Sequence, residues 1–286
     1  RTFGTYVSIY DFKRAVDDGA TVPLYYENRS DMLQITNPEI NDELLDAIEA
    51  ADLDVNQQAK LELELAKDIH IITSEPRLDT IAKDFVEHYT DVWTSGKAMF
   101  VCLNKVTCVR MYNLAQKYWA QKITETEAAL KKTTSQQAYQ ELERKLQWLK
   151  ETEMAVVISQ EQNEIQTFKK WGLDILPHRT KMEKRELDKE FKDSANPFRI
   201  VFVCAMWLTG FDVKSLSCLY LDKPLKAHTL MQTIARANRV AEGKSNGLIV
   251  DYIGIVIIIV LIILHLTSVV QDAKDYAEID PMPERP

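Results

Sequence analysis

An amide and two guanidinium groups are spaced for one helical face near the carboxyl-terminal part of the sequence. Gln232, Arg236 and Arg239 are separated by four and three residues. At about 100° per residue, these side chains would project in a similar direction. A guanidinium stays charged at physiological pH and offers a planar fork of donors that matches phosphoryl oxygens. The spacing predicts a surface that binds a polyphosphate, with a solvated helix face as the structural alternative.

A second group of candidate residues follows an apolar, strand-like segment. Gly210 lets the backbone approach a ligand, because it has no side chain, and Asp212 could accept hydrogen bonds from a ribose hydroxyl or orient a neighbouring arginine. In a parallel sheet, the loops at the carboxyl ends of the strands form the binding crevice, so we expect both groups at that edge. A strand-to-helix turn capped by the aspartate is the structural alternative.

Apolar, strand-like segments alternate with helical patterns along most of the chain. Strands that alternate with helices imply right-handed crossovers and a parallel sheet covered on both faces. Residues 1–32 contain short alternations typical of strands at the edge of such a sheet. The pattern therefore predicts an α/β fold with a parallel sheet flanked by helices. The other predicted strands cover residues 98–103, 154–159, 198–204, 216–221 and 247–252.

Several helices are predicted around these strands. One opens at Ser74 and Pro76 and carries an apolar stripe that includes Phe85. The Lys- and Glu-rich segment 122–153 has an apolar stripe and is predicted to be a helical insertion exposed on one side. The remaining predicted helices cover residues 41–73, a stretch after Leu103, 179–192 and 227–241.

Composition and charge limit the possible functions. The chain has 286 residues, of which 46% are hydrophobic, enough to fill a core. A net charge of -8 argues against binding nucleic acid by bulk attraction, so any DNA contact must be local.

The histidines show no metal-ligand spacing. Cys102, Cys108, Cys204 and Cys218 form no CxxC pair, which predicts free buried thiols in a reducing compartment, the cytoplasm, with no zinc site.

An aliphatic run of ten residues at 255–264 is shorter than an ordinary membrane span, which is the less favoured alternative for this segment. Such a span needs about 20 apolar residues. A buried strand or helix is therefore favoured, and no membrane partner is expected. The sequence starts without methionine and without a signal-peptide pattern, so we expect a piece of a longer protein.

Three segments of the chain resemble the R subunit (HsdR) of type I restriction-modification enzymes. The similarity is to the second RecA-like domain of that subunit's superfamily-two helicase motor. Residues 206–213 correspond to motif V and residues 232–239 to motif VI. The segments that carry the resemblance are 198–213, 219–225 and 228–240.

Weaker resemblance covers most of the chain up to residue 254. Residues 97–112 resemble the strand and helix of motif IV, and residues 3–26 resemble the stretch that joins the two motor domains. The implied organisation is a connecting region at 1–75, a second RecA-like domain at 76–254 with a helical insertion at about 121–153, and a flanking segment at 255–286 that would begin a helical region.

The resemblance implies a translocase on double-stranded DNA that hydrolyses ATP, with Mg²⁺, between two RecA-like lobes. By position, Arg239 would be the arginine finger, Arg236 a second contact to the transferred phosphate and Gln232 a nucleotide sensor. Gly210 with Asp212 would couple the nucleotide to the DNA-facing loop.

Residues that could contact DNA are fewer. Lys105 opens the helix after the first core strand, and Thr209 belongs to the motif V segment. Phosphate contacts from such residues supply affinity without sequence specificity. A solvated surface is the alternative for a further basic group, which consists of Arg179, Lys181, Lys184 and Arg185.

Parts of a complete motor are missing from the sequence. It contains no GxxxxGK[ST] loop, no DEAD-like acidic box and no assignable nuclease carboxylates. The first motor lobe, the amino-terminal nuclease and the modification and specificity subunits would then be partners, and the chain alone would neither hydrolyse ATP nor cleave DNA. The alternatives are another nucleic-acid helicase that shares motifs V and VI, and a non-catalytic interaction module that keeps the RecA-like fold as a scaffold.

Overall fold

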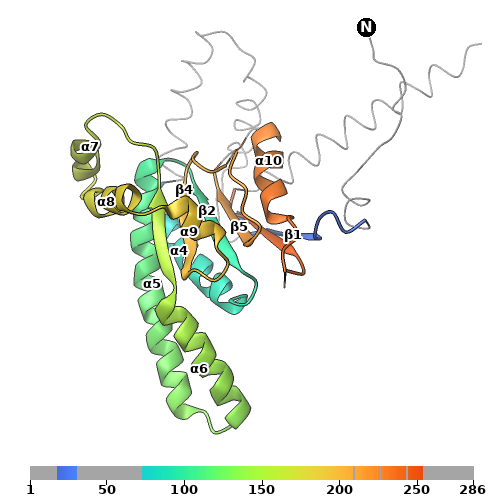
Figure 1. Cartoon of the computed structure of the whole chain (residues 1–286). Helices are drawn as coiled ribbons and strands as arrows, with labels where there is room; N and C mark the ends of the chain where they lie inside the picture. The colour runs from blue at the N-terminus through green and yellow to red at the C-terminus, as the bar shows by residue number, and fades with distance from the viewer. Residues whose placement is uncertain are drawn as a thin grey trace, which may run out of the picture. The chain divides into compact units, whose positions relative to one another are not determined.

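A computed structural model describes residues 18–30, 73–208, 210–223, 225, 227–242 and 244–253. Within these residues, six parallel strands form one sheet in the order β1-β6-β5-β2-β4-β3 (Figure 1). The predicted α/β fold with a parallel sheet is thereby confirmed. The strands are β1 (Leu24–Asn28), β2 (Lys97–Cys102), β3 (Glu153–Val157), β4 (Phe198–Val203), β5 (Leu216–Asp222) and β6 (Gly247–Asp251).

The two central strands, β2 and β5, are buried along their whole length. Continuous apolar runs are expected in parallel strands that are covered on both faces. Helix α4 (Glu75–Asp91) packs on these strands through Phe85, whose ring meets Phe100 and Tyr220 edge-on with centroids 5.2 and 4.7 Å apart. Each such pair adds about 0.5–1.5 kcal/mol beyond the burial of its area. The centre of the sheet is therefore a well-packed platform.

A helical hairpin of α5 (Lys105–Lys132) and α6 (Gln136–Glu151) extends beyond the sheet, with the two helices side by side (Figure 1). The Nε1–H group of Trp119 in α5 donates a hydrogen bond to the carbonyl of Leu149 in α6 at 2.9 Å. The sequence predicted a helical insertion at about 121–153. In the structure, α5 runs unbroken from the carboxyl end of β2 into the hairpin, because its apolar face continues from the core to α6.

The region predicted to be one helix at 179–192 contains two. Helix α8 (Leu176–Lys184) ends where Arg185 adopts an extended backbone, and α9 (Leu187–Lys192) follows. The Arg185 guanidinium forms ion pairs with Glu153 of β3 and with Glu190 of α9. These pairs stabilise the break. Before them, α7 (Glu164–Lys170) is a separate short helix.

Strand β1 confirms the edge strand expected within residues 1–32, because it pairs in parallel with β6 at one edge of the sheet. The described residues belong to one compact unit that ends at Ile253. None of their helices has the length and apolar character of a membrane-spanning segment. The helix predicted at 41–73 and the aliphatic run at 255–264 lie outside the described residues, apart from Thr73.

Candidate functional site

Helix α10 (Ala227–Ala237) carries Arg236 toward the amino ends of the strands, and Arg239 follows two residues after the helix ends. A Cβ on Gly247, the first residue of β6, would lie 2.1 Å from the carbonyl oxygen of Ala237, the last residue of α10. Only glycine permits this approach. The sequence predicted a site at the carboxyl edge. The β5–α10–β6 crossover instead returns the chain antiparallel to the strands, so the residues after α10 lie at the amino edge.

Arg239 lies outside α10, so the prediction of a helical face shared with Gln232 and Arg236 is wrong. The helix ends at Ala237, not at residue 241. Arg239 forms an antiparallel bridge with Thr21, and the Val22 N–H group donates to the Asn238 carbonyl at 2.8 Å. The backbone after α10 therefore pairs with the segment before β1, which replaces the expected last helical turn.

Both arginines still lie beside the loop between β4 and β5. The distance from Arg239 Nε to Asp212 Oδ1 is 3.5 Å, and these side chains are 56% and 57% exposed. An exposed pair of this kind is weak, so the guanidinium can exchange Asp212 for another anion. Arg236 Nε–H donates to the Leu208 carbonyl at 2.9 Å. Burial lowers the pKa of Arg236, Asp212 raises it and Arg239 lowers it, but a guanidinium remains charged throughout the physiological range.

Aromatic stacking holds the β4–β5 loop. The rings of Trp207 and Phe211 stack with centroids 4.1 Å apart, and Trp207 also packs on Phe191. Trp207 has a φ of 67°, a left-handed conformation that costs about 1–3 kcal/mol for a bulky residue. The stack offsets part of this cost and fixes the loop that carries Asp212. Sequence reasoning missed Trp207, because no spacing or composition signals a tryptophan with positive φ.

Gly210 has a backbone conformation that favours glycine. Its φ is 71°, and no described atom lies within 4 Å of the position that its Cβ would take. The space beside it is open, as a backbone approach to a ligand requires. Gln232 is an exposed residue of α10, and Thr209 lies outside the described residues.

Lys105, a predicted DNA contact, lies away from the two arginines and pairs with a carboxylate of the same domain. Lys105 opens α5 next to the carboxyl end of β2, at the edge opposite to Arg239. Its Nζ lies 2.5 Å from a Glu161 carboxylate oxygen. An internal partner of this kind competes with a DNA phosphate for the same ammonium group.

The basic group on and just after α8 forms mostly contacts within the domain. Arg179 pairs with Glu164 at 2.7 Å, and Lys181 donates to the Met154 carbonyl at 2.9 Å. Together with Arg185, these residues tie α8 to the β3 side of the sheet. Lys184 is exposed. The structure therefore gives three of the four charges a role in packing.

All four cysteines are free and buried, as the sequence predicted. Burial raises the pKa of the Cys102 thiol, which disfavours the reactive thiolate. Among the residues that the structure describes, no group of three His, Cys, Asp or Glu side chains is placed to hold a metal ion.

Comparisons with known proteins cover nearly the whole chain. The family described as "Type I restriction enzyme subunit R domain 3" matches residues 94–254, and the family "SWI2/SNF2 ATPase" matches residues 1–59. The HindI endonuclease subunit of a type I restriction enzyme from Haemophilus influenzae is 35% identical over 263 residues, which are 88% of this chain and 21% of that protein. The MjaIXP endonuclease subunit from Methanocaldococcus jannaschii, assigned to the same type, is 36% identical over 256 residues, with the same coverage.

The chain spans about a fifth of the length of these curated relatives. Among solved structures, a fragment assigned to an HsdR subunit from Vibrio vulnificus matches with a TM-score of 0.47 and 15% identity. That match covers 87% of this chain and 35% of the other.

Proposed function

Because this chain belongs to the R-subunit family of type I restriction enzymes, we propose that it forms one side of an ATP-dependent motor that translocates double-stranded DNA. ATP and Mg²⁺ would bind in the intact subunit, between this domain and a first motor lobe. The observation that carries the proposal is the pairing of an exposed Arg239 with Asp212, beside an Arg236 that is anchored to the same loop.

Arg239 takes the role of an arginine finger. Its guanidinium is more than half exposed, and its one described carboxylate partner is 3.5 Å away. A phosphate oxygen in the shared site can therefore replace Asp212 at small cost. Phosphoryl transfer is accelerated mainly by positioning and charge neutralisation, and an arginine finger contributes roughly 10³ to 10⁵ in rate in the GTPase examples.

Arg236 acts as a second phosphate contact and as a link to the β4–β5 loop. Its Nε–H bond to the Leu208 carbonyl joins α10 to the loop that holds Gly210 and Asp212. A shift of α10 at the phosphate is thereby passed to this loop, which couples ATP to the DNA-facing side together with Thr209. Gln232, exposed on the same helix, senses the nucleotide.

The other domains and subunits of the restriction enzyme would be partners of this domain. The sequence holds no phosphate-binding GxxxxGK[ST] loop, which the first motor lobe would supply. A nuclease domain in the same subunit would cut DNA, and modification and specificity subunits would recognise the target, all in the cytoplasm. The chain alone is then inactive, and the intact subunit is a site-specific deoxyribonuclease with DNA-dependent ATPase activity.

The test is DNA-stimulated ATP hydrolysis by the intact subunit with Arg239→Ala, measured at matched ATP occupancy. Turnover is expected to fall by about 10³ or more while ATP binding is retained. Arg144→Ala is the matched control, because Arg144 is an exposed arginine on α6, away from the site. Unchanged turnover in Arg239→Ala would refute the finger role and favour the non-catalytic interaction module.

A further inference from the structure

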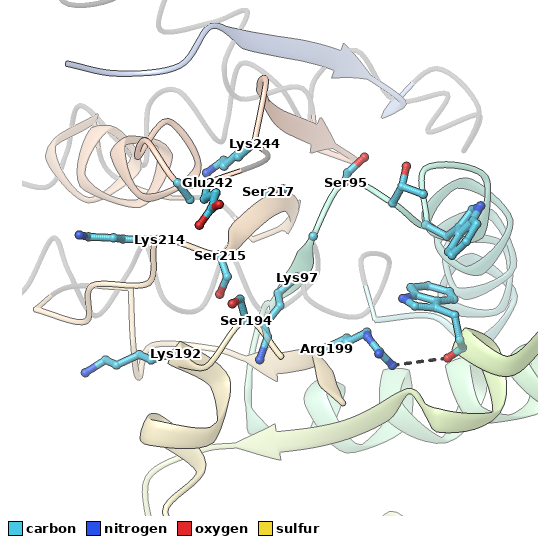
Figure 2. Close-up of a pocket in the computed structure, with 15 residues that line it drawn as sticks. Ser95, Lys97, Lys192, Ser194, Arg199, Lys214, Ser215, Ser217, Glu242 and Lys244 are labelled. Atoms are coloured by element: carbon cyan, nitrogen blue, oxygen red, sulfur yellow. Dashed lines mark hydrogen bonds between the residues drawn. The ribbon is translucent and has the colours of Figure 1, made fainter. Parts of the chain in front are cut away.

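A second concave site opens at the amino ends of the central strands. The pocket has a volume of about 650 Å³ and includes the starts of three strands, with Lys97 on β2, Arg199 on β4 and Ser217 on β5 (Figure 2). Small-molecule sites commonly enclose about 300–1,000 Å³. The pocket therefore has the size of a site for a nucleotide-sized ligand.

Positive charge dominates the lining. Five cationic side chains face one carboxylate, that of Glu242. Within the described part of the chain, none of the four lysines forms a salt bridge, and the ion pair of Arg199 with Glu151 is long, at 3.9 Å. Arg199 also donates a hydrogen bond to the Thr152 hydroxyl at 3.1 Å. An excess of four positive charges in a concave site attracts an anion. The five cations are Lys97, Lys192, Arg199, Lys214 and Lys244.

Two of these lysines are held by backbone carbonyls in place of carboxylates. Lys97 is only 2% exposed, and its Nζ donates to the Glu190 carbonyl at 3.1 Å. Lys244 Nζ donates to the Leu216 carbonyl at 2.5 Å. A carbonyl group orients an ammonium group without neutralising its charge. Both lysines therefore bring positive charge to the lining of the pocket.

Burial disfavours the charged forms of both lysines and lowers their pKa values. Burial lowers the pKa of Lys97 to about 8, against the opposing effect of Asp193 and Glu190 and with a further lowering by Arg199. Burial likewise lowers the pKa of Lys244 to about 8, and Cys218 opposes that shift. A bound anion would stabilise both charged forms.

The rest of the lining suits a phosphate ester. Figure 2 shows Ser194 and Ser215 close to Lys97 at the centre of the pocket, with Lys192 and Lys214 on one side. Serine hydroxyl groups donate hydrogen bonds to phosphate oxygens. The lining also includes Trp93 and Trp148, whose rings meet with centroids 5.8 Å apart. Their partly buried rings offer an apolar wall for an attached base.

We propose that this pocket binds a nucleoside polyphosphate, with its phosphates at Lys97, Lys192 and Lys214 and its base toward Trp148. Nucleic acid fits less well, because a concave pocket of limited volume receives a small ligand more readily than a duplex, and the chain carries a net charge of -8. Asp212, Arg236 and Arg239 are not among the lining residues, so the proposal does not rest on the motor function.

The test is isothermal titration of the 286-residue chain with inorganic tripolyphosphate and with ATP. The decisive variant is Lys192→Ala/Lys214→Ala, because both lysines are exposed. We expect the wild type to bind each ligand with a dissociation constant below about 1 mM. The double variant should lose at least roughly tenfold in affinity, since it lacks two charged contacts. Tighter binding of ATP than of tripolyphosphate is expected from the base.

The control is Lys169→Ala/Lys170→Ala, which removes the same charge from the exposed surface of α7 and should change affinity less than about twofold. An equal loss of affinity in both double variants would mean that only the net charge of the chain matters, and would overturn the proposal. Equal thermal unfolding midpoints of all variants show that any loss is local.

Two further arms separate this pocket from other sites. A loss of binding in Arg239→Ala, with normal binding by the Lys192/Lys214 variant, would assign the ligand to the candidate motor site and overturn the proposal. A short DNA duplex that binds more tightly than ATP, and loses affinity in the Lys192/Lys214 variant, would make the pocket a nucleic-acid contact.

Wild-type affinity should fall as pH rises from 7 to 9, because Lys97 and Lys244 lose their protons near pH 8.

Discussion

At the scale of single residues, the two arginines of the candidate site differ in what holds them. Arg239 faces an exposed carboxylate, whereas Arg236 is fixed by a hydrogen bond to a backbone carbonyl. The first arrangement leaves a guanidinium free to change partner, and the second gives it a fixed position. Sequence spacing identified both residues but could not separate these two roles, because the difference depends on the path of the β4–β5 loop.

Arg236→Lys tests the linking role. The lysine keeps the charge but lacks the Nε–H group that donates to Leu208. DNA-stimulated ATP turnover by the intact subunit is expected to fall by about tenfold or more, because a charged hydrogen bond is lost. Arg144→Lys, on the exposed face of α6, should leave turnover unchanged. Wild-type turnover in Arg236→Lys would mean that charge alone matters at this position.

Gly247→Ala tests the close approach of α10 to β6. Its Cβ would lie 2.1 Å from the Ala237 carbonyl oxygen, so the helix or strand must shift, at an expected cost of about 1–3 kcal/mol or more. Gly172→Ala is the control, with a φ of 68° but no described atom within 4 Å, and should cost about 1 kcal/mol. Urea denaturation of the chain measures both. Equal losses would contradict the packing argument.

His178 predicts a loss of stability in acid. Burial lowers its pKa to about 4, with a further lowering by Lys181 and an opposing effect of Asp174. An unfolded histidine titrates near pH 6.5. The folded state therefore favours the neutral ring, and this contribution is complete above pH 6.5 and is lost as pH falls toward 4. The centroids of the His178 and Tyr112 rings are 4.7 Å apart. His178→Phe therefore keeps an aromatic ring beside Tyr112.

The measurement is the free energy of unfolding of wild type and His178→Phe between pH 7 and pH 4. The variant should lose less stability over this range than the wild type. Carboxylates with lowered pKa values act equally in both proteins, so the difference isolates His178. Parallel curves would show that folding does not lower the pKa of His178.

At the scale of secondary-structure elements, the sheet was readable from the sequence because buried parallel strands are continuous apolar runs. β4 and β6 fall within predicted segments, and β2, β3 and β5 each extend one residue beyond them. The helices were less readable at their ends. The break at Arg185 depends in part on an ion pair with Glu153, which is distant in sequence, and the end of α10 depends on pairing with residues 21–22. Helical periodicity contains no information about either contact.

The edge of the sheet at which the site lies was also predicted wrongly. The rule for carboxyl-terminal loops applies to residues directly after a strand. Asp212 instead belongs to a loop that leaves β4 and returns to the start of β5, and Arg239 follows a helix that has already crossed the sheet. The two residues meet because both segments travel back toward the amino edge.

Val22→Pro tests whether the pairing between the segment before β1 and the end of α10 positions Arg239. Proline removes the N–H group that donates to Asn238, whereas Val22→Ala keeps it. ATP turnover by the intact subunit should fall at least severalfold in the proline variant and remain near wild type in the alanine variant. Equal turnover in the two variants would show that Arg239 is positioned without this hydrogen bond.

At the scale of the whole molecule, the chain is proposed to be half of a catalytic unit. Its own side chains can neutralise charge on a phosphate, but no GxxxxGK[ST] loop is present in its sequence. The chain alone should show no DNA-stimulated ATP hydrolysis above background. Addition of a separately produced amino-terminal part of the same subunit should restore measurable turnover, and Arg239→Ala in this chain should prevent the restoration. Hydrolysis by the chain alone would refute the shared-site proposal.

The bridge between Thr21 and Arg239 has a mechanical consequence. The peptide group of Val22 connects the start of β1 directly to the residue that follows α10. A tensile force applied to the chain ahead of β1 would thus reach the Arg239 backbone through one hydrogen bond and a few peptide units. The fold therefore provides a short force-bearing route from the segment ahead of β1 to the backbone of Arg239.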